Sequence, residues 1–127
     1  MKLKILIIED NEQNMYMLTY LLEEKYQVLQ AFNGIDGVDI ARRELPDVIL
    51  LDIQLPGMDG YAIASELRKH DNLKKIPVIA VTSYAMLGDK ERIMKAGATG
   101  YIEKPIDPET FIAQMISFLP DYLINKY

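Results

Sequence analysis

The stretch that decides the fold reads Asp-Val-Ile-Leu-Leu-Asp-Ile-Gln-Leu-Pro-Gly-Met-Asp-Gly and spans residues 47–60. It contains an unbroken apolar run from Val48 to Leu51, which Asp52 ends. An apolar run of this length between acids is typical of a strand buried on both faces, as in a parallel sheet covered by helices. Open α/β sheets bind their ligands at the carboxyl ends of their strands. The sequence therefore places the Asp52 carboxylate at the mouth of such a sheet.

Length and composition limit the protein class. The chain has 127 residues, 50% of them hydrophobic, which fits one domain with a sizeable core. Its net charge of -5 argues against nucleic acid as a partner. The absence of cysteine excludes disulfides and thiolate metal sites. The apolar runs are too short for a secretory signal or a membrane span, so we expect a soluble, cytoplasmic protein without a membrane partner.

Apolar runs alternate with helical patterns along the rest of the chain. Strands are expected at 5–8, 27–31, 48–51, 78–81 and 101–103. Helices are expected at 12–24, 35–43, 61–70 and 87–96, and a last helix follows an Asp107 cap with Pro108 in its first turn. This repeat predicts one parallel sheet with helices on both faces. The whole chain forms one domain, with its core at about 4–119 and a C-terminal tail at 120–127.

Polar side chains end four of the predicted strands and meet at one edge of the sheet. They are Glu9 and Asp10, Asp52, Thr82, and Lys104. Two carboxylates about 4 Å apart repel by about 4 kcal/mol at an effective dielectric constant of ~20, so a cation must compensate. Lys104 offsets part of this charge. Since the ligands are oxygens, Mg²⁺ fits the remainder better than Zn²⁺, and Mn²⁺ is also acceptable.

This combination of groups is suited to phosphoryl transfer. An aspartate can attack phosphorus to form an acyl phosphate. A metal ion and Lys104 would stabilise charge on the transferring oxygens, and the Thr82 hydroxyl can donate a hydrogen bond to one of them.

These residues, in this order, resemble a response-regulator receiver domain, similar to the chemotaxis regulator and closer still to single-domain regulators of the DivK type. The resemblance covers the chain from residue 4 to about 119. The matching features are Glu9-Asp10, Asp52 within its loop motif, Thr82 in Val-Thr-Ser, Tyr101, and Lys104-Pro105.

The resemblance implies a flavodoxin-like, doubly wound, five-stranded α/β fold with strand order 2-1-3-4-5. It also implies that Asp52 accepts a phosphoryl group from a histidine kinase or a histidine phosphotransfer protein in a Mg²⁺-dependent step. Glu9, Asp10, Asp52 and the Gln54 backbone carbonyl would hold the metal, and Lys104 would pair with the phosphoryl group. Like the rest of the family, the chain would catalyse only its own phosphorylation and dephosphorylation and would not otherwise be an enzyme.

Further roles follow from the same resemblance. Thr82 and Tyr101 are the expected switch pair, although Tyr101 is alternatively a packed aromatic residue without a switching role. The surface built by residues 87–119 would contact the downstream protein. The bond before Pro105 is expected to be cis. Gln54 and Tyr84 lie two residues beyond Asp52 and Thr82, and the bulk of Tyr84 predicts slow loss of the phosphoryl group.

Four other interpretations of the sequence compete with a receiver domain. A haloacid-dehalogenase phosphatase needs a second acid where Gln54 stands, and a flavodoxin needs a Ser-, Thr- and Gly-rich loop where Glu9 and Asp10 stand. A pseudo-receiver that acts only as an interaction module, and a receiver from a hybrid histidine kinase, remain open.

His70, the only histidine, is expected to be exposed and to carry no phosphohistidine role. The sequence names neither the kinase, the output partner nor the oligomeric state.

Overall fold

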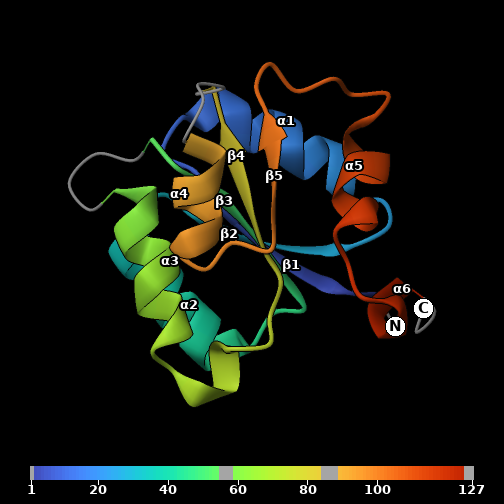
Figure 1. Ribbon diagram of the computed structural model, residues 1–127. Coiled ribbons are helices and arrows are strands. Elements are labelled where there is room, and N and C mark those ends of the chain that lie inside the picture. Colours follow the sequence, from blue (N-terminus) through green and yellow to red (C-terminus); the bar gives the residue numbers. More distant parts are fainter. Residues whose placement is uncertain (1, 55–58, 84–88, 125–127) are drawn as a thin grey trace.

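Five parallel strands form the centre of the computed structural model, which describes residues 2–54, 59–83 and 89–124 (Figure 1). The strands are β1 (Lys4–Ile8), β2 (Gln27–Ala31), β3 (Val48–Asp52), β4 (Val78–Thr82) and β5 (Gly100–Glu103). Their order across the sheet is β2-β1-β3-β4-β5, and every neighbouring pair is parallel. The structure thus confirms the expected fold class and strand order.

Helices cover both faces of this sheet. They are α1 (Glu12–Leu22), α2 (Gly34–Glu44), α3 (Gly60–Arg68), α4 (Asp89–Lys95), α5 (Phe111–Ser117) and α6 (Asp121–Ile124), with a 3-10 turn, η1 (Asp71–Leu73), after α3. Figure 1 shows α2, α3 and α4 on one side of the sheet and α1 and α5 on the other. Two apolar clusters, one on each side, form the core.

The central strand β3 supplies both clusters. Ile49 and Leu51 pack under α2, α3 and α4, whereas Val48 and Leu50 pack under α1 and α5. All four side chains are buried, as the unbroken apolar run predicts for a strand covered on both faces. Burying each of them contributes roughly 1.5–3 kcal/mol to folding. The same burial fixes the register of β3, and Asp52 is thereby held at its carboxyl end.

Most helix boundaries were predicted to within a few residues. The Asn11 side chain accepts a hydrogen bond of 2.9 Å from the Asn14 amide and caps α1. Asp59 caps α3 in the same way, with 2.9 Å to the Ala62 amide. Gly97 follows α4 with a φ of 119°, a backbone conformation that favours glycine at the end of a helix.

The predicted start of the last long helix was wrong. The Asp107 carboxylate accepts a hydrogen bond of 2.9 Å from the Glu109 amide, but it stabilises a turn over residues 108–110. The helix itself begins at Phe111, after Thr110. Pro108 therefore lies in a turn before α5 and not at its first helical position.

Two further expectations need correction. Residues 121–124 form the short helix α6, whose Leu123 is only 4% exposed and packs into the cluster under α1 and α5, so the core extends beyond residue 119. The His70 side chain is 25% exposed, because it lies against the end of α3, and it is not the freely exposed group that we expected. Tyr84, the motif residues 55–58 and the predicted start of the fourth helix at 87–88 lie outside the described residues.

No helix within the described ranges is long and apolar enough to cross a membrane.

Candidate functional site

The carboxylate of Asp52 lies at the centre of the edge where the strands end. Asp52 is the last residue of β3 and is 4% exposed. On one side, the pairing of Leu51 with Ile8 of β1 brings Glu9 next to it. On the other side, Asp52 pairs with Val81 of β4, so Thr82 follows directly. The parallel register therefore places Glu9, Asp52 and Thr82, which lie far apart in the sequence, next to one another.

Three carboxylates form a cluster at this edge. The side-chain oxygens of Glu9, Asp10 and Asp52 lie within 4.8 Å of one another. Glu9 and Asp52 are buried, whereas Asp10 is exposed. Backbone amides orient two of them, since Asn11 donates to Glu9 Oε2 at 3.2 Å and Gln54 donates to Asp52 Oδ1 at 2.9 Å. The turns after β1 and β3 thus fix the positions of the buried carboxylates.

Lys104 supplies the cationic group of the cluster. Its Nζ lies 3.3 Å from Glu9 Oε1 and 3.6 Å from Asp52 Oδ1. Its backbone amide donates to the Thr82 carbonyl at 2.8 Å, which continues the pairing of β4 and β5. The following bond to Pro105 is cis, as expected. Lys104 is therefore held over two of the three carboxylates and balances only part of their charge.

Burial and the neighbouring carboxylate change the acidity of Glu9. Desolvation is the largest cause, followed by the hydrogen bond to Asp52 and its charge, and together they raise the pKa of Glu9 from 4.5 to about 7. The Asn11 amide and Lys104 act in the opposite direction but are weaker. Near neutral pH the Glu9 carboxyl of the metal-free site is therefore only partly ionised.

The donor set fits a hard divalent cation. Its three members, as far as the structure describes the chain, are all carboxylates. Mg²⁺ prefers such oxygen ligands to nitrogen or sulfur ligands. The exposed Asp10 leaves one side of the cluster open to solvent. Lys104 supplies one positive charge beside three carboxylates and does not neutralise the site alone. A divalent cation would supply the missing charge.

Thr82 and Tyr101 lie on neighbouring strands beside this cluster. Thr82 ends β4 and is fully buried. Tyr101 of β5 pairs with Ala80, two residues before Thr82. Its half-buried ring packs against the apolar core cluster under α2, α3 and α4. The Lys90 Nζ of α4 lies 5.3 Å from the centre of the ring. Tyr101 thus connects the strand edge to α4.

The sequence assigned no role to Ser83, yet it contacts one of the predicted site residues. Ser83 Oγ donates a 2.6 Å hydrogen bond to Gln54 Oε1, which joins the residues that follow β3 and β4. Its place directly after Thr82 is the sequence signal that would have identified it. Of the predicted site residues, the structure brings together Glu9, Asp10, Asp52, Gln54 and Lys104 and places Thr82 alongside, whereas Tyr84 lies outside the described residues.

Sequence comparison decides the family. A model described as the response regulator receiver domain matches residues 5–116. The chain belongs to the response regulator receiver family. This receiver is 45% identical over 118 residues to the polar-differentiation response regulator DivK of Brucella anthropi. The aligned residues make up 92% of this chain and 96% of that relative. DivK of Brucella ovis is 43% identical over the same shares of both chains.

Solved structures agree with this assignment. The receiver matches chemotaxis protein CheY4 of Vibrio cholerae with a TM-score of 0.89 and 27% identity, over 94% of this chain and 100% of that chain. It matches the receiver domain of a Pseudomonas aeruginosa sensor histidine kinase with a TM-score of 0.85 and 33% identity, over 93% and 98% of the two chains. That structure has a magnesium ion coordinated in its active-site cleft.

The family places this chain in two-component signalling, as expected from the sequence. The phosphatase and flavodoxin interpretations are not favoured. A kinase is the general class of partner that the family implies, and the acidic cluster fits the magnesium ion seen in the related receiver.

Proposed function

We propose that Asp52 accepts a phosphoryl group from a phosphohistidine of a histidine kinase or a histidine phosphotransfer protein. The observation that carries this proposal is the position of Asp52, at the end of the central strand, between two further carboxylates and the Lys104 ammonium. Its backbone contact through the Gln54 amide holds the carboxylate in place before a donor arrives. Such preorganisation lowers the barrier because the groups need little rearrangement during the reaction.

In the proposed reaction an Asp52 oxygen forms a bond to phosphorus while the bond between phosphorus and the donor imidazole nitrogen breaks. The imidazole leaves with the electron pair of that bond. Lys104, already 3.6 Å from Asp52 Oδ1, pairs with the transferring phosphoryl oxygens. The carboxylates of Glu9, Asp10 and Asp52 and the Gln54 carbonyl would hold Mg²⁺, with Mn²⁺ as a substitute. When bound, this ion neutralises charge on the phosphoryl oxygens.

Thr82 and Tyr101 are proposed to couple phosphorylation of Asp52 to a change in the protein surface at α4. The Thr82 hydroxyl would turn toward the new phosphoryl oxygens, and the Tyr101 ring would then move inward. Movement of that ring changes its contact with Lys90 and hence the position of α4. The phosphoryl group shifts the balance between two states because it contacts one of them better. Thr82→Ala is expected to uncouple partner binding from phosphorylation while Asp52 still accepts the group.

Gln54 and Tyr84 are proposed to set the lifetime of the acyl phosphate. The hydrogen bond from Ser83 restrains the Gln54 side chain beside Asp52. A bulky residue at position 84 would hinder an attacking water, so Tyr84→Ala should hydrolyse faster than the unmodified sequence.

The remaining assignments concern context. We propose that the chain is a single receiver domain that acts in the cytoplasm, that catalyses only its own phosphorylation and dephosphorylation, and that signals through a protein. The surface around α4, β5 and α5 is the proposed contact for this output partner.

The test is intact mass spectrometry after incubation with acetyl phosphate and Mg²⁺. We expect a gain of one phosphoryl group, no gain with a chelator, and no gain in Asp52→Asn. Asp71→Asn is the matched control, because its side chain is 94% exposed and lies at the opposite end of the sheet. Absence of any gain in the unmodified protein would favour the pseudo-receiver.

A further inference from the structure

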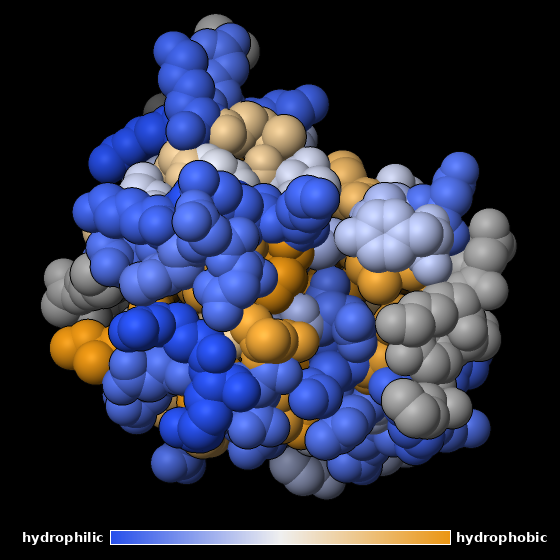
Figure 2. Space-filling model, turned by 90° about the horizontal axis from the view of Figure 1, so that it is seen from below, coloured by the Kyte–Doolittle hydropathy of each residue, from blue (hydrophilic) through white to orange (hydrophobic). Residues whose placement is uncertain are grey.

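A second polar cleft lies at the end of the sheet opposite the carboxylates, with a volume of about 740 Å³. Its walls are the last turns of α2 and α3 and the adjoining η1. Figure 2 views the molecule from this end and shows mostly hydrophilic residues around scattered apolar ones. The volume is within the range of small-molecule binding sites.

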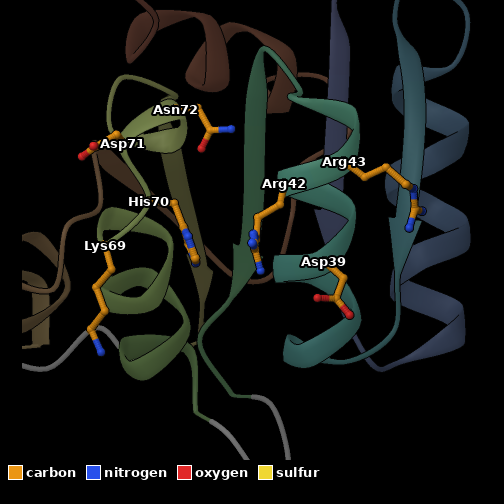
Figure 3. A pocket seen from close by; sticks show the side chains of 7 residues that line it. All are labelled: Asp39, Arg42, Arg43, Lys69, His70, Asp71 and Asn72. Carbon is orange, nitrogen blue, oxygen red and sulfur yellow. The ribbon is translucent and has the colours of Figure 1, made fainter.

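Figure 3 distinguishes the side chains that extend into this cleft from those at its rim. Arg42 of α2 and His70, at the end of α3, extend into the gap between the two helices. Arg43 and Lys69 extend toward the outer sides of their helices, and Asn72 lies near one end of the gap. The cleft therefore presents hydrogen-bond donors from two separate helices.

The charged groups at the rim have partners outside the cleft. Lys69 Nζ lies 3.2 Å from the Glu66 carboxylate, and Arg43 Nε lies 3.6 Å from the neighbouring glutamate. The Asp71 carboxylate is paired with Lys74 at 2.9 Å. These pairs leave little charge from the rim groups to be matched by a ligand.

Arg42 differs from these groups. It forms no ion pair or hydrogen bond with any described residue, although the chain carries a net charge of -5. The helix dipole favours a positive charge in the last turn of α2. That effect would be the same for any cationic side chain, whichever way it pointed, so it does not explain why the Arg42 guanidinium extends into the cleft. The planar guanidinium can donate two parallel hydrogen bonds to a phosphate.

His70 stands across the gap from Arg42. Its Nε2 is enclosed and has no hydrogen-bond partner among the described residues, since Glu66 Oε1 is 3.8 Å away. An unpaired buried group of this kind is unfavourable. The ring extends toward the gap that the Arg42 side chain also faces. An anion placed in this gap would therefore contact both the guanidinium and the imidazole ring.

Asp39 limits the type of anion. It lines the other end of the cleft, is exposed, and has no described ion-pair partner. Its carboxylate would repel a second anionic group but can accept hydrogen bonds from a neutral one. We propose that this cleft binds a nucleoside monophosphate, with the phosphate between Arg42 and His70 and the nucleoside toward Asp39. This site is independent of phosphorylation at Asp52.

The test is a titration of the uniformly ¹⁵N-labelled protein with AMP, GMP, CMP and UMP in turn, followed by NMR. A chelator is present throughout, so that the acidic site holds no divalent cation that could attract phosphate. We expect saturable shifts for the amides of residues 39–44 and 69–73 with at least one nucleotide and weaker binding of inorganic phosphate and of the free nucleoside. No saturable shift with any nucleotide, or equal binding of inorganic phosphate, would overturn the proposal.

Two matched variants separate a site from general attraction. Arg42→Gln is expected to weaken binding at least tenfold, because it removes a charge-assisted pair of hydrogen bonds. Lys75→Gln removes the same charge from an exposed residue that does not line the cleft, and it should change binding less than twofold. Equal effects of both variants would show non-specific attraction and overturn the proposal. Both positions are exposed, so both variants are expected to fold.

Discussion

Replacement of Glu9 by glutamine tests the electrostatics of the acidic cluster. The pKa of Glu9 is about 7 in the folded protein against an ordinary value of 4.5, so the folded state binds the proton more tightly than the unfolded chain. The stability that this proton provides is complete below pH 4.5 and is lost as the pH rises to 7. At about 1.4 kcal/mol per pKa unit, the loss in metal-free protein amounts to about 3 kcal/mol.

Glutamine has the shape of the protonated glutamate and remains neutral. In the native site the Asn11 amide and Lys104 donate to different oxygens of Glu9, so the single oxygen of glutamine keeps only one of these two hydrogen bonds. In Glu9→Gln the free energy of unfolding should therefore stay nearly constant between pH 5 and pH 8. At pH 8 the variant should exceed the unmodified protein by about 2 kcal/mol, because the lost hydrogen bond offsets roughly 1 kcal/mol of the gain, and this corresponds to several degrees in melting temperature for a domain of this size.

The assay is urea and thermal unfolding at pH 5 and pH 8 in a chelator, repeated with Mg²⁺. Glu91→Gln is the matched control, because Glu91 is exposed on α4 and the same substitution there should leave the pH dependence unchanged. Added Mg²⁺ should stabilise the unmodified protein at pH 8 more than Glu9→Gln. The reasoning is refuted if Glu9→Gln and the unmodified protein lose equal stability between pH 5 and pH 8.

Three further changes have expected outcomes. Lys104→Met should lower the rate of phosphorylation by acetyl phosphate at least tenfold, measured by intact mass, because no other described cation contacts Asp52; an unchanged rate would remove Lys104 from the mechanism. Leu123→Ala should destabilise the fold by about 2–5 kcal/mol in urea, against less than about 0.5 kcal/mol for Tyr122→Ala, which is 62% exposed; equal losses would mean that α6 does not pack. Arg68→Ala should lower the melting temperature by several degrees, because the guanidinium donates hydrogen bonds of 2.8 to 3.1 Å to the backbone carbonyls of four residues. Arg68→Lys should recover only part of that loss.

The strands were predictable because burial on both faces leaves a plain signal in the sequence. The run ending at Leu51 contains no polar residue, so the position of Asp52 after it followed directly. Asn11 and Asp59, which cap α1 and α3 through local hydrogen bonds, stand just before the helices expected from residues 12 and 61. Local interactions and continuous apolar runs are therefore sufficient for these parts of the fold.

The C-terminal segment was less predictable, because competing local signals there are resolved by packing. Residues 120–127 were expected to form a tail, yet the Pro120 carbonyl accepts from the amides of Leu123 and Ile124 and begins α6. The burial of Leu123 under α1 and α5 makes this turn stable, and no local pattern indicates that contact. Asp107 similarly caps a turn whose length depends on where Phe111 enters the core.

The members of the acidic cluster were predictable, but their energetics were not. Parallel strands bring their carboxyl ends to one edge, so the meeting of Glu9, Asp52 and Lys104 followed from the strand assignments. The raised pKa of Glu9 depends on the degree of burial and on its distance from Asp52. The hydrogen bond from Ser83 to Gln54 depends on side-chain conformations. Both require the three-dimensional structure.

The central claim is that Asp52 is the residue that carries the phosphoryl group, and a chemical map tests it most directly. The protein is incubated with acetyl phosphate and Mg²⁺, and reduction with sodium borohydride then converts an aspartyl phosphate to homoserine. Peptide mass spectrometry locates the converted residue. We predict homoserine at position 52 alone, and none when the metal is chelated. Conversion at position 10 or any other aspartate, with Asp52 unmodified, would contradict the account.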